Sequence, residues 1–275
     1  MSIVTVASDS WSRGAEVARK AAQALDYRLL ADDEVLAEAA RRHGVRENRL
    51  RQALFEPPSL LGMSRARRQR NIAYLQATLA DALLEDRAVY HGPFGHLLLP
   101  GVAHVIRVRV TADQQARLEL ARSRDGLPAS RARRSLRQEE RQRRFWTAEL
   151  CRLDTDAAEL YDLVINTTNL DVAQVVQQIV EAAGNRRFAP TTYSRERLAQ
   201  LALETRVRAA LVNIDPGVRV RAEQGQVTVQ TVAPQARAQR RTAQIQEQAS
   251  SVDGVTSVQV EVVPDRLSDI ARSMR

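Results

Sequence analysis

The sequence predicts an α/β protein built on a mainly parallel sheet and followed by a small α+β module. Up to about residue 184, short apolar runs alternate with longer amphipathic helical stretches, an order typical of a parallel sheet covered by helices. Beyond residue 196, three segments alternate apolar and polar residues with period two, and two helical patterns accompany them. A chain of 275 residues is long enough for two such domains, each with a buried core.

Four strands are expected in the first part of the chain. They are short runs rich in apolar residues, and they lie at residues 2–7, 87–92, 102–110 and 161–167. One helical region covers residues 32–86 with a proline-containing interruption at 56–62, and a second, rich in arginine, covers 112–150. Because the interruptions divide the helical regions, we expect separate helical lobes beside the sheet.

A break follows at residues 184–194, where Gly184, Pro190 and a polar run interrupt two helical patterns. We expect a first domain at 1–184, a linker at 185–195, a second domain at 196–264 and a tail at 265–275. The second domain is expected to have the order helix, strand, strand, helix, strand (αββαβ). Its elements are predicted at 196–212, 218–223, 226–232, 235–250 and 256–263, with the first two strands joined across Gln224-Gly225.

The composition is basic, with 41 Lys and Arg against 33 Asp and Glu and a formal net charge of +8. Such a balance fits attraction to phosphate, nucleic acid or an anionic membrane surface. Lys20 is the only lysine, so the bias toward arginine reflects genome composition more plausibly than function. The single cysteine, Cys151, excludes an intrachain disulfide, and the sequence has neither a signal-peptide pattern nor an apolar membrane span. We therefore expect a cytoplasmic protein.

Several segments between residues 2 and 182 carry a family resemblance. ELYDLVINTTNLDVAQVVQQIVEA (159–182) combines a strand, an Asn-Thr turn and a closing helix, AVYHGPFGHLLL (88–99) combines a strand and a turn, and EERQRRFW (139–146) bears arginines. With these segments the chain resembles the cytidylate-kinase-like family of P-loop nucleoside monophosphate kinases. The resemblance implies a phosphate loop after the first strand, an acceptor lobe, a helical lid with arginines, and the use of ATP and Mg²⁺.

The second module resembles a different family. GQVTVQTVA (225–233) and VDGVTSVQVEV (252–262) are similar to the glycine-led strand and the final strand of the BON domain. That resemblance implies association with proteins or with phospholipid surfaces. Val218 and Val220 alternate with Arg219 and Arg221, which predicts one buried and one wet face. The strands lack an exposed aromatic residue or a basic cluster that would hold lipid headgroups, so a protein partner or docking within the chain is the simpler expectation.

The phosphate loop departs from the pattern that the resemblance implies. A loop of the Gly-x-x-x-x-Gly-Lys-Ser/Thr type uses glycines to wrap the phosphates, a lysine to neutralise them and a hydroxyl to hold magnesium. Those four positions are Ser8, Arg13, Gly14 and Ala15 here. Trp11 also stands where the family has glycine, and because a bulky residue disfavours positive φ we expect a reshaped loop. Ser12, Arg13 and Gly14 remain as candidate phosphate-binding residues.

The other candidate sites are the lid and two turns. In the lid, Arg137, Arg141 and Arg143 are candidate phosphate contacts, because guanidinium groups stabilise charge on a transferring phosphoryl group; beside Glu139 and Glu140 they also fit a solvated helix. Pro93 stands where the resemblance places an acceptor-binding arginine. Asp32 and Asp33 are interpreted as an N-cap. His91 and His96 are read as turn residues, and we assign no catalytic residue and no metal ligand.

Three functions compete. The first is a nucleotide-sensing or scaffolding pseudoenzyme with a degenerate phosphate loop and a BON-like interaction module. The second is a divergent (d)CMP-type kinase that transfers the γ-phosphoryl group of ATP to a nucleoside monophosphate. The third is an adaptor at a membrane surface or on a protein. Expected partners are a nucleotide or phosphate, a protein, or a phospholipid surface, and we expect no specific nucleic acid. The sequence leaves enzymatic activity, acceptor and oligomeric state open.

Overall fold

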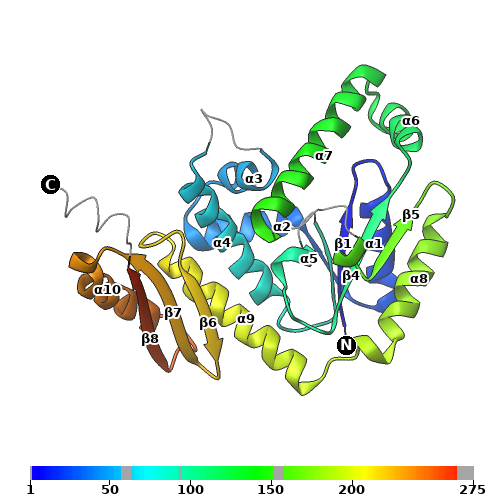
Figure 1. Ribbon diagram of the computed structural model, residues 1–275. Helices are drawn as coiled ribbons and strands as arrows, with labels where there is room; N and C mark the ends of the chain where they lie inside the picture. Colours follow the sequence, from blue (N-terminus) through cyan, green and yellow to red (C-terminus); the bar gives the residue numbers. More distant parts are fainter. Residues whose placement is uncertain (1, 57–62, 93–94, 152–157, 265–275) are drawn as a thin grey trace. The chain divides into compact units, whose positions relative to one another are not determined.

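The computed structural model describes residues 2–56, 63–92, 95–151 and 158–264 (Figure 1). The contacts within the chain define two units. The first unit contains residues 1–37, 55–57 and 85–195, and the second contains 38–54, 58–84 and 196–275. The interruption expected at 56–62, apart from residue 56, and the tail expected at 265–275 lie outside the described residues. The two units are described one at a time.

The first unit is built on a five-stranded parallel sheet with the order β2-β3-β1-β4-β5. Its strands are β1 (Ile3–Ser8), β2 (Arg28–Ala31), β3 (Ala88–His91), β4 (Val105–Thr111) and β5 (Leu163–Asn166). The α/β class predicted from the sequence is confirmed, but the edge strand β2 was not predicted. It has four residues with one buried side chain, too short a run for a period-two or apolar pattern to stand out.

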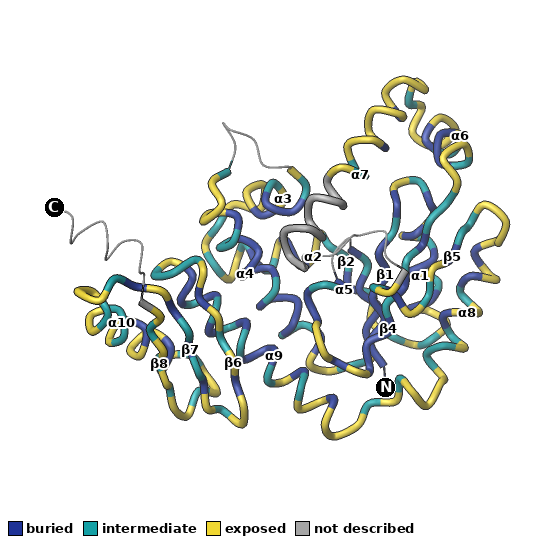
Figure 2. The backbone as a smooth tube through the Cα atoms, viewed as in Figure 1, coloured by how far each residue is buried: buried dark blue, intermediate teal, exposed yellow. Residues whose placement is uncertain are grey.

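Helices α1 (Gly14–Leu25) and α8 (Val172–Gly184) cover one face of this sheet. Val17, Ala18 and Ala21 of α1 and Val175 and Ile179 of α8 face the sheet, and all are fully or almost fully buried. Figure 2 shows the central strands β1 and β4 as the most buried part of this unit. The core therefore fixes the carboxyl end of β1, where the following loop begins. The short helix α5 (Gly95–Leu98) lies against β1.

Helices α6 (Gln114–Asp125) and α7 (Ala129–Cys151) form an antiparallel pair in the same unit (Figure 1). They replace the single helical region expected at 112–150, because Gly126 ends α6 with a φ of 63° and α7 begins just after Pro128. Their small apolar core consists of Leu118, Ala121, Ala132 and Leu136, and the partly buried Trp11 and Leu127 pack against it.

The second unit contains the helices α3 (Glu47–Phe55, up to Leu54), α4 (Arg65–Ala82) and α9 (Thr192–Leu211, from Glu196). Helix α2 (Asp32–His43) has residues in both units. Asp81 of α4 forms ion pairs with Arg42 and with Arg206 of α9, and Asn213 donates a hydrogen bond to Tyr74 of α4. Helix α4 thus packs with α9, the helix that opens the C-terminal module.

The C-terminal sheet has the order β6-β7-β8, with β6 (Arg219–Glu223) antiparallel and β8 (Ser257–Pro264) parallel to β7 (Gln226–Ala233). Helix α10 (Ala238–Ser250) completes the predicted αββαβ order. Helix α9 begins at Thr192, earlier than predicted, because Thr191 and Ser194 exchange hydrogen bonds around its first turn. The wet face expected at Arg219 and Arg221 is confirmed, since both are exposed. In the described helices, none is long and apolar enough to cross a bilayer.

Candidate functional site

The loop between β1 and α1 has the left-handed turns that a phosphate loop needs. Trp11 has a φ of 56° and Arg13 a φ of 62°, without glycine at either position. The expectation that Trp11 would avoid positive φ was wrong. Its indole Nε1–H donates a 2.7 Å hydrogen bond to Asp125, and its ring packs on the α6–α7 core, so tertiary contacts hold the turn.

Buried hydrogen bonds join this loop to the ends of strands β4 and β5. The hydroxyl of Ser12 donates to the carbonyl oxygens of Asp9 and Val110 at 2.7 and 3.1 Å, and the hydroxyl of Thr167 donates to the carbonyl of Ser12. Ser12 is buried, so its hydroxyl serves the loop's own structure. Arg13 precedes α1, is exposed, and pairs with Glu16.

Gly14 allows the loop to close on Ser8. A Cβ placed at Gly14 would lie 2.1 Å from the Cβ of Ser8, so the side chain at position 8 takes the space that Gly14 leaves free. Ser8 Oγ lies 3.0 Å from Nε2 of His91, and burial lowers the pKa of His91. His91, expected as a turn residue, therefore ends β3 as the partner of Ser8. Pro93 and the side chain of His96 lie outside the described residues.

Asp32 and Asp33 are the first two residues of α2, so the N-cap expected there was wrong. In the first turn of a helix, carboxylates still stabilise its amino end through the helix dipole. Asp32 also accepts a 2.6 Å hydrogen bond from the hydroxyl of Tyr90. Burial and the Asp32 carboxylate raise the pKa of Tyr90 well above its usual value, which keeps the phenol protonated.

A buried carboxylate stands inside the loop. Asp9 accepts a 2.7 Å hydrogen bond from the hydroxyl of Thr111, and its oxygens lie 3.7 and 3.6 Å from the guanidinium groups of Arg109 and Arg117. Asp9 is 6% exposed and Arg117 is 4% exposed. Two arginines that face the loop are thus paired with a carboxylate of the loop itself.

A second carboxylate comes from α7. Glu139 Oε1 accepts a 2.8 Å hydrogen bond from the backbone amide of Ser10, and Glu139 Oε2 lies 2.9 Å from Arg117. Arg117 also donates from Nε to the carbonyl of Ser10 at 2.8 Å. Burial raises the pKa of Glu139, while the Ser10 amide and Arg117 oppose that shift. Arg117 therefore connects the loop, its own helix α6 and helix α7.

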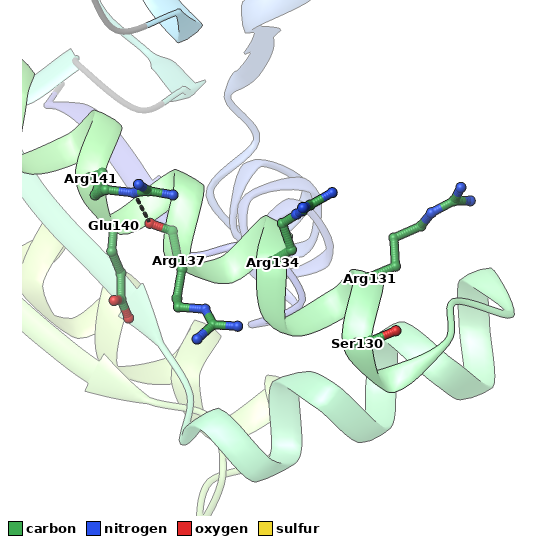
Figure 3. Close-up of a pocket in the computed structure, with 6 residues that line it drawn as sticks. All are labelled: Ser130, Arg131, Arg134, Arg137, Glu140 and Arg141. Atoms are coloured by element: carbon green, nitrogen blue, oxygen red, sulfur yellow. Dashed lines mark hydrogen bonds between the residues drawn. The ribbon is translucent and has the colours of Figure 1, made fainter.

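The lid arginines lie on the exposed side of α7. Ser130, Arg131, Arg134, Arg137, Glu140 and Arg141 line an open pocket of about 940 Å³. Figure 3 shows their guanidinium groups spread along the helix rather than converging on one point. Arg141 donates from Nε to the carbonyl of Arg137 at 3.3 Å. The side chain of Arg143 lies outside the described residues.

A second pocket lies beside the amino end of α1. It has a volume of about 580 Å³, and its ionisable lining residues are Arg13, Glu16, Arg19, His91 and Arg124. Three guanidinium groups against one carboxylate leave this cavity with an excess of positive charge, which suits a phosphate-bearing ligand. In the part of the chain that the structure describes, no three His, Cys, Asp or Glu side chains gather around a possible metal position.

The comparisons with known proteins agree with this fold. Residues 3–169 match the model of the Cytidylate kinase-like family, so the chain belongs to that family. The chain is 25% identical over 181 residues to a cytidylate kinase of Archaeoglobus fulgidus, a match that covers 65% of this chain and 93% of that protein. An uncharacterized protein from Eubacterium ventriosum superposes with a TM-score of 0.51 at 19% identity, over 68% of this chain and 100% of that one.

The sequence did not point to four residues of this site. No motif or periodic pattern singles out Asp9, Arg109 or Arg117, and the sequence pattern around Glu139 is typical of a solvated helix. Each lies in a different element, and Ser10 and Glu139 are separated by 129 positions. The one available signal was the position of Arg117 beside Leu118 and Ala121 on α6, since an arginine on the inner side of an amphipathic helix needs an anionic partner.

Proposed function

We propose that this chain is a nucleotide-sensing or scaffolding pseudoenzyme of the cytidylate-kinase-like family. One observation carries the proposal: carboxylates occupy the loop where a kinase presents positive charge. Asp9 pairs with Arg109 and Arg117. Glu139 accepts a hydrogen bond from the Ser10 amide and pairs with a second nitrogen of Arg117. Phosphoryl transfer depends on cations and donors aimed at the phosphates, and here Arg109, Arg117 and the Ser10 amide already have carboxylate partners.

The residues present do not fit an ATP–magnesium donor site in this arrangement. The position of the phosphate-neutralising lysine holds Gly14, and the position of the magnesium-binding hydroxyl holds Ala15. The sole lysine, Lys20, pairs with Glu16 on the surface of α1. We infer that any nucleotide bound here stays chemically unchanged.

The proposal is tested by measuring ADP release with ATP, magnesium and CMP, dCMP or UMP. We expect the native chain, an Arg141→Ala/Arg143→Ala variant and a blank without protein to give the same rate. An Arg131→Ala/Arg134→Ala variant is the matched control for loss of charge on α7. Turnover that the first variant abolishes and the matched control preserves would overturn the pseudoenzyme proposal.

The second candidate is a divergent (d)CMP-type kinase that uses ATP and magnesium. Two observations favour it: the family match, and the left-handed turns at Trp11 and Arg13, which retain the backbone shape of a phosphate loop. In that case Ser12, Arg13 and Gly14 would cradle the phosphates through their amides, and Arg137, Arg141 and Arg143 would approach them from α7. The same assay decides between the two candidates.

We propose further that residues 196–264 act as a BON-like module that binds a protein, following a kinase-like domain at 1–184 and a linker at 185–195. The outer face of its sheet supports a polar partner, because polar side chains alternate there with the buried positions. They include Arg219, Arg221, Gln230 and Glu261. The rival is an adaptor at a phospholipid surface. Flotation of the full chain with anionic vesicles would favour the rival, and failure to float favours a protein partner.

A further inference from the structure

The amide of Ser10 and the guanidinium of Arg117 form an anion site, and a residue of the same chain fills it. Backbone N–H groups of a loop that leads into a helix, together with an arginine, are the groups that bind phosphate oxygens. Here both donors bind Glu139, one to each carboxylate oxygen, at 2.8 and 2.9 Å. The carboxylate thus takes the place that two oxygens of a phosphate group would take.

Glu139 is held there against a desolvation penalty. Its side chain is 24% exposed, and that of Arg117 is 5% exposed. The charged groups that face it are Arg117 from α6 and Asp9 from the loop, and Asp9 repels it. The contact therefore depends on two charge-assisted hydrogen bonds to a carboxylate that would otherwise favour solvent. A ligand with more charge and more acceptor oxygens can compete for the same donors.

We propose that Glu139 is an internal competitor for the phosphate groups of a nucleoside diphosphate or triphosphate, so that binding at the loop requires this part of α7 to move away. The inference rests on the proposed function only in that the loop binds nucleotides. The apparent affinity of such a site is its intrinsic affinity multiplied by the fraction of molecules in which the site is open. Glu139 therefore sets the apparent affinity of the loop for phosphate groups. The lid of this protein thereby regulates its own loop.

Inorganic pyrophosphate with magnesium is the probe, since it carries the phosphate groups without a base. Its affinity is measured by calorimetry on the full chain. We expect Glu139→Gln to bind pyrophosphate about tenfold more tightly than the native chain, because the neutral amide loses both charge-assisted bonds. The matched control is Glu140→Gln, which makes the same change one position away on the pocket side of α7 and leaves affinity unchanged.

A second variant separates reach from charge. Glu139→Asp keeps the negative charge but shortens the side chain by one methylene, so its carboxylate no longer spans the Ser10 amide and Arg117 together. We expect it also to bind pyrophosphate more tightly than the native chain. Melting curves confirm that each variant is folded, and either variant alone suffices for the test.

Three outcomes are decisive. Tighter binding by the Glu139 variants but not by Glu140→Gln supports the internal competitor. Equal affinity of the native chain and the Glu139 variants, or no binding in any of them, overturns it. Neither of these latter results decides whether the chain is an enzyme, which the kinase assay tests separately. No binding in any of them would leave only the scaffolding form of the pseudoenzyme proposal.

Discussion

The β1–α1 loop and the β6–β7 turn both place side chains in left-handed backbone, yet for different reasons. In the turn, Gln224 and Gly225 have φ values of 48° and 83°, as a two-residue hairpin requires, and one of them is glycine. In the loop, Trp11 and Arg13 adopt 56° and 62° without any glycine. Local sequence explains the hairpin, whereas the loop depends on contacts made by distant elements.

This difference shows where family features persist. The shape of the hairpin depends on its own two turn residues, so it can be predicted from the local sequence. The loop adopts left-handed backbone at Trp11 and Arg13 without glycine, because Asp125 holds Trp11 and Arg117 holds Ser10. Tertiary contacts hold the backbone of this loop, whereas local sequence holds the hairpin, and the predictions below test that difference.

Arg117→Ala gives the largest expected effect. The change leaves Glu139 without its guanidinium and removes one of the two that face Asp9, and breaking a buried ion pair on one side costs about 3 kcal/mol of unfolding free energy. Urea denaturation measures the loss. In the variant, the amides of the β1–α1 loop should exchange hydrogen faster than in the native chain, whereas the amides of the β6–β7 hairpin should exchange at the native rate.

The matched control for that variant is Arg124→Ala on the same helix, an exposed arginine whose removal should change stability by less than about 0.5 kcal/mol. Equal effects of the two changes would mean that Arg117 does not hold the loop, and the contrast between loop and hairpin would then be unfounded.

Gly14→Ala gives the next largest expected loss of stability. The added methyl group would meet Ser8 at 2.1 Å, and overpacking of this kind costs about 1–3 kcal/mol. Combining it with Ser8→Gly removes the obstacle, so the double variant should recover most of the lost melting temperature. Gly184→Ala, where nothing lies within 4 Å, is the control. A double variant no more stable than Gly14→Ala would show that space at position 8 is not the reason for Gly14.

Most of the fold could be predicted from the sequence, because strands such as 102–110 and the C-terminal alternation are long enough to show a period. The edge strand β2 could not, since a strand of four residues at a sheet edge has too few buried positions. The start of α9 was placed too late because its capping pair, Thr191 and Ser194, lay in a segment read as linker.

The candidate site was less predictable. The sequence identified the loop itself and the roles missing from it at Arg13, Gly14 and Ala15. It gave no indication of the ion-pair network, because Asp9, Arg109, Arg117 and Glu139 meet only once β1, β4, α6 and α7 are folded together. Pairing between distant charged residues leaves no periodic trace in a single sequence.

The smallest expected effect compares the two regions directly by placing glycine at one left-handed position in each. Arg13→Gly relieves a backbone penalty of about 1 kcal/mol, which stabilises the folded chain. Two losses oppose this gain: the exposed ion pair with Glu16, which contributes less than about 1 kcal/mol, and the greater freedom of glycine in the unfolded chain. Gln224→Gly relieves the same penalty in the hairpin.

We expect Gln224→Gly to raise the free energy of unfolding by about 0.5 kcal/mol and Arg13→Gly to raise it by less, because Arg13→Gly also removes the ion pair with Glu16; denaturant titration of the full chain measures both. Similar gains would mean that the cost of left-handed backbone is local in both regions. A gain at position 224 with a loss of more than about 1 kcal/mol at position 13 would contradict this, since so large a loss would require the Arg13 side chain to hold the loop in a way that its exposed contact with Glu16 does not explain.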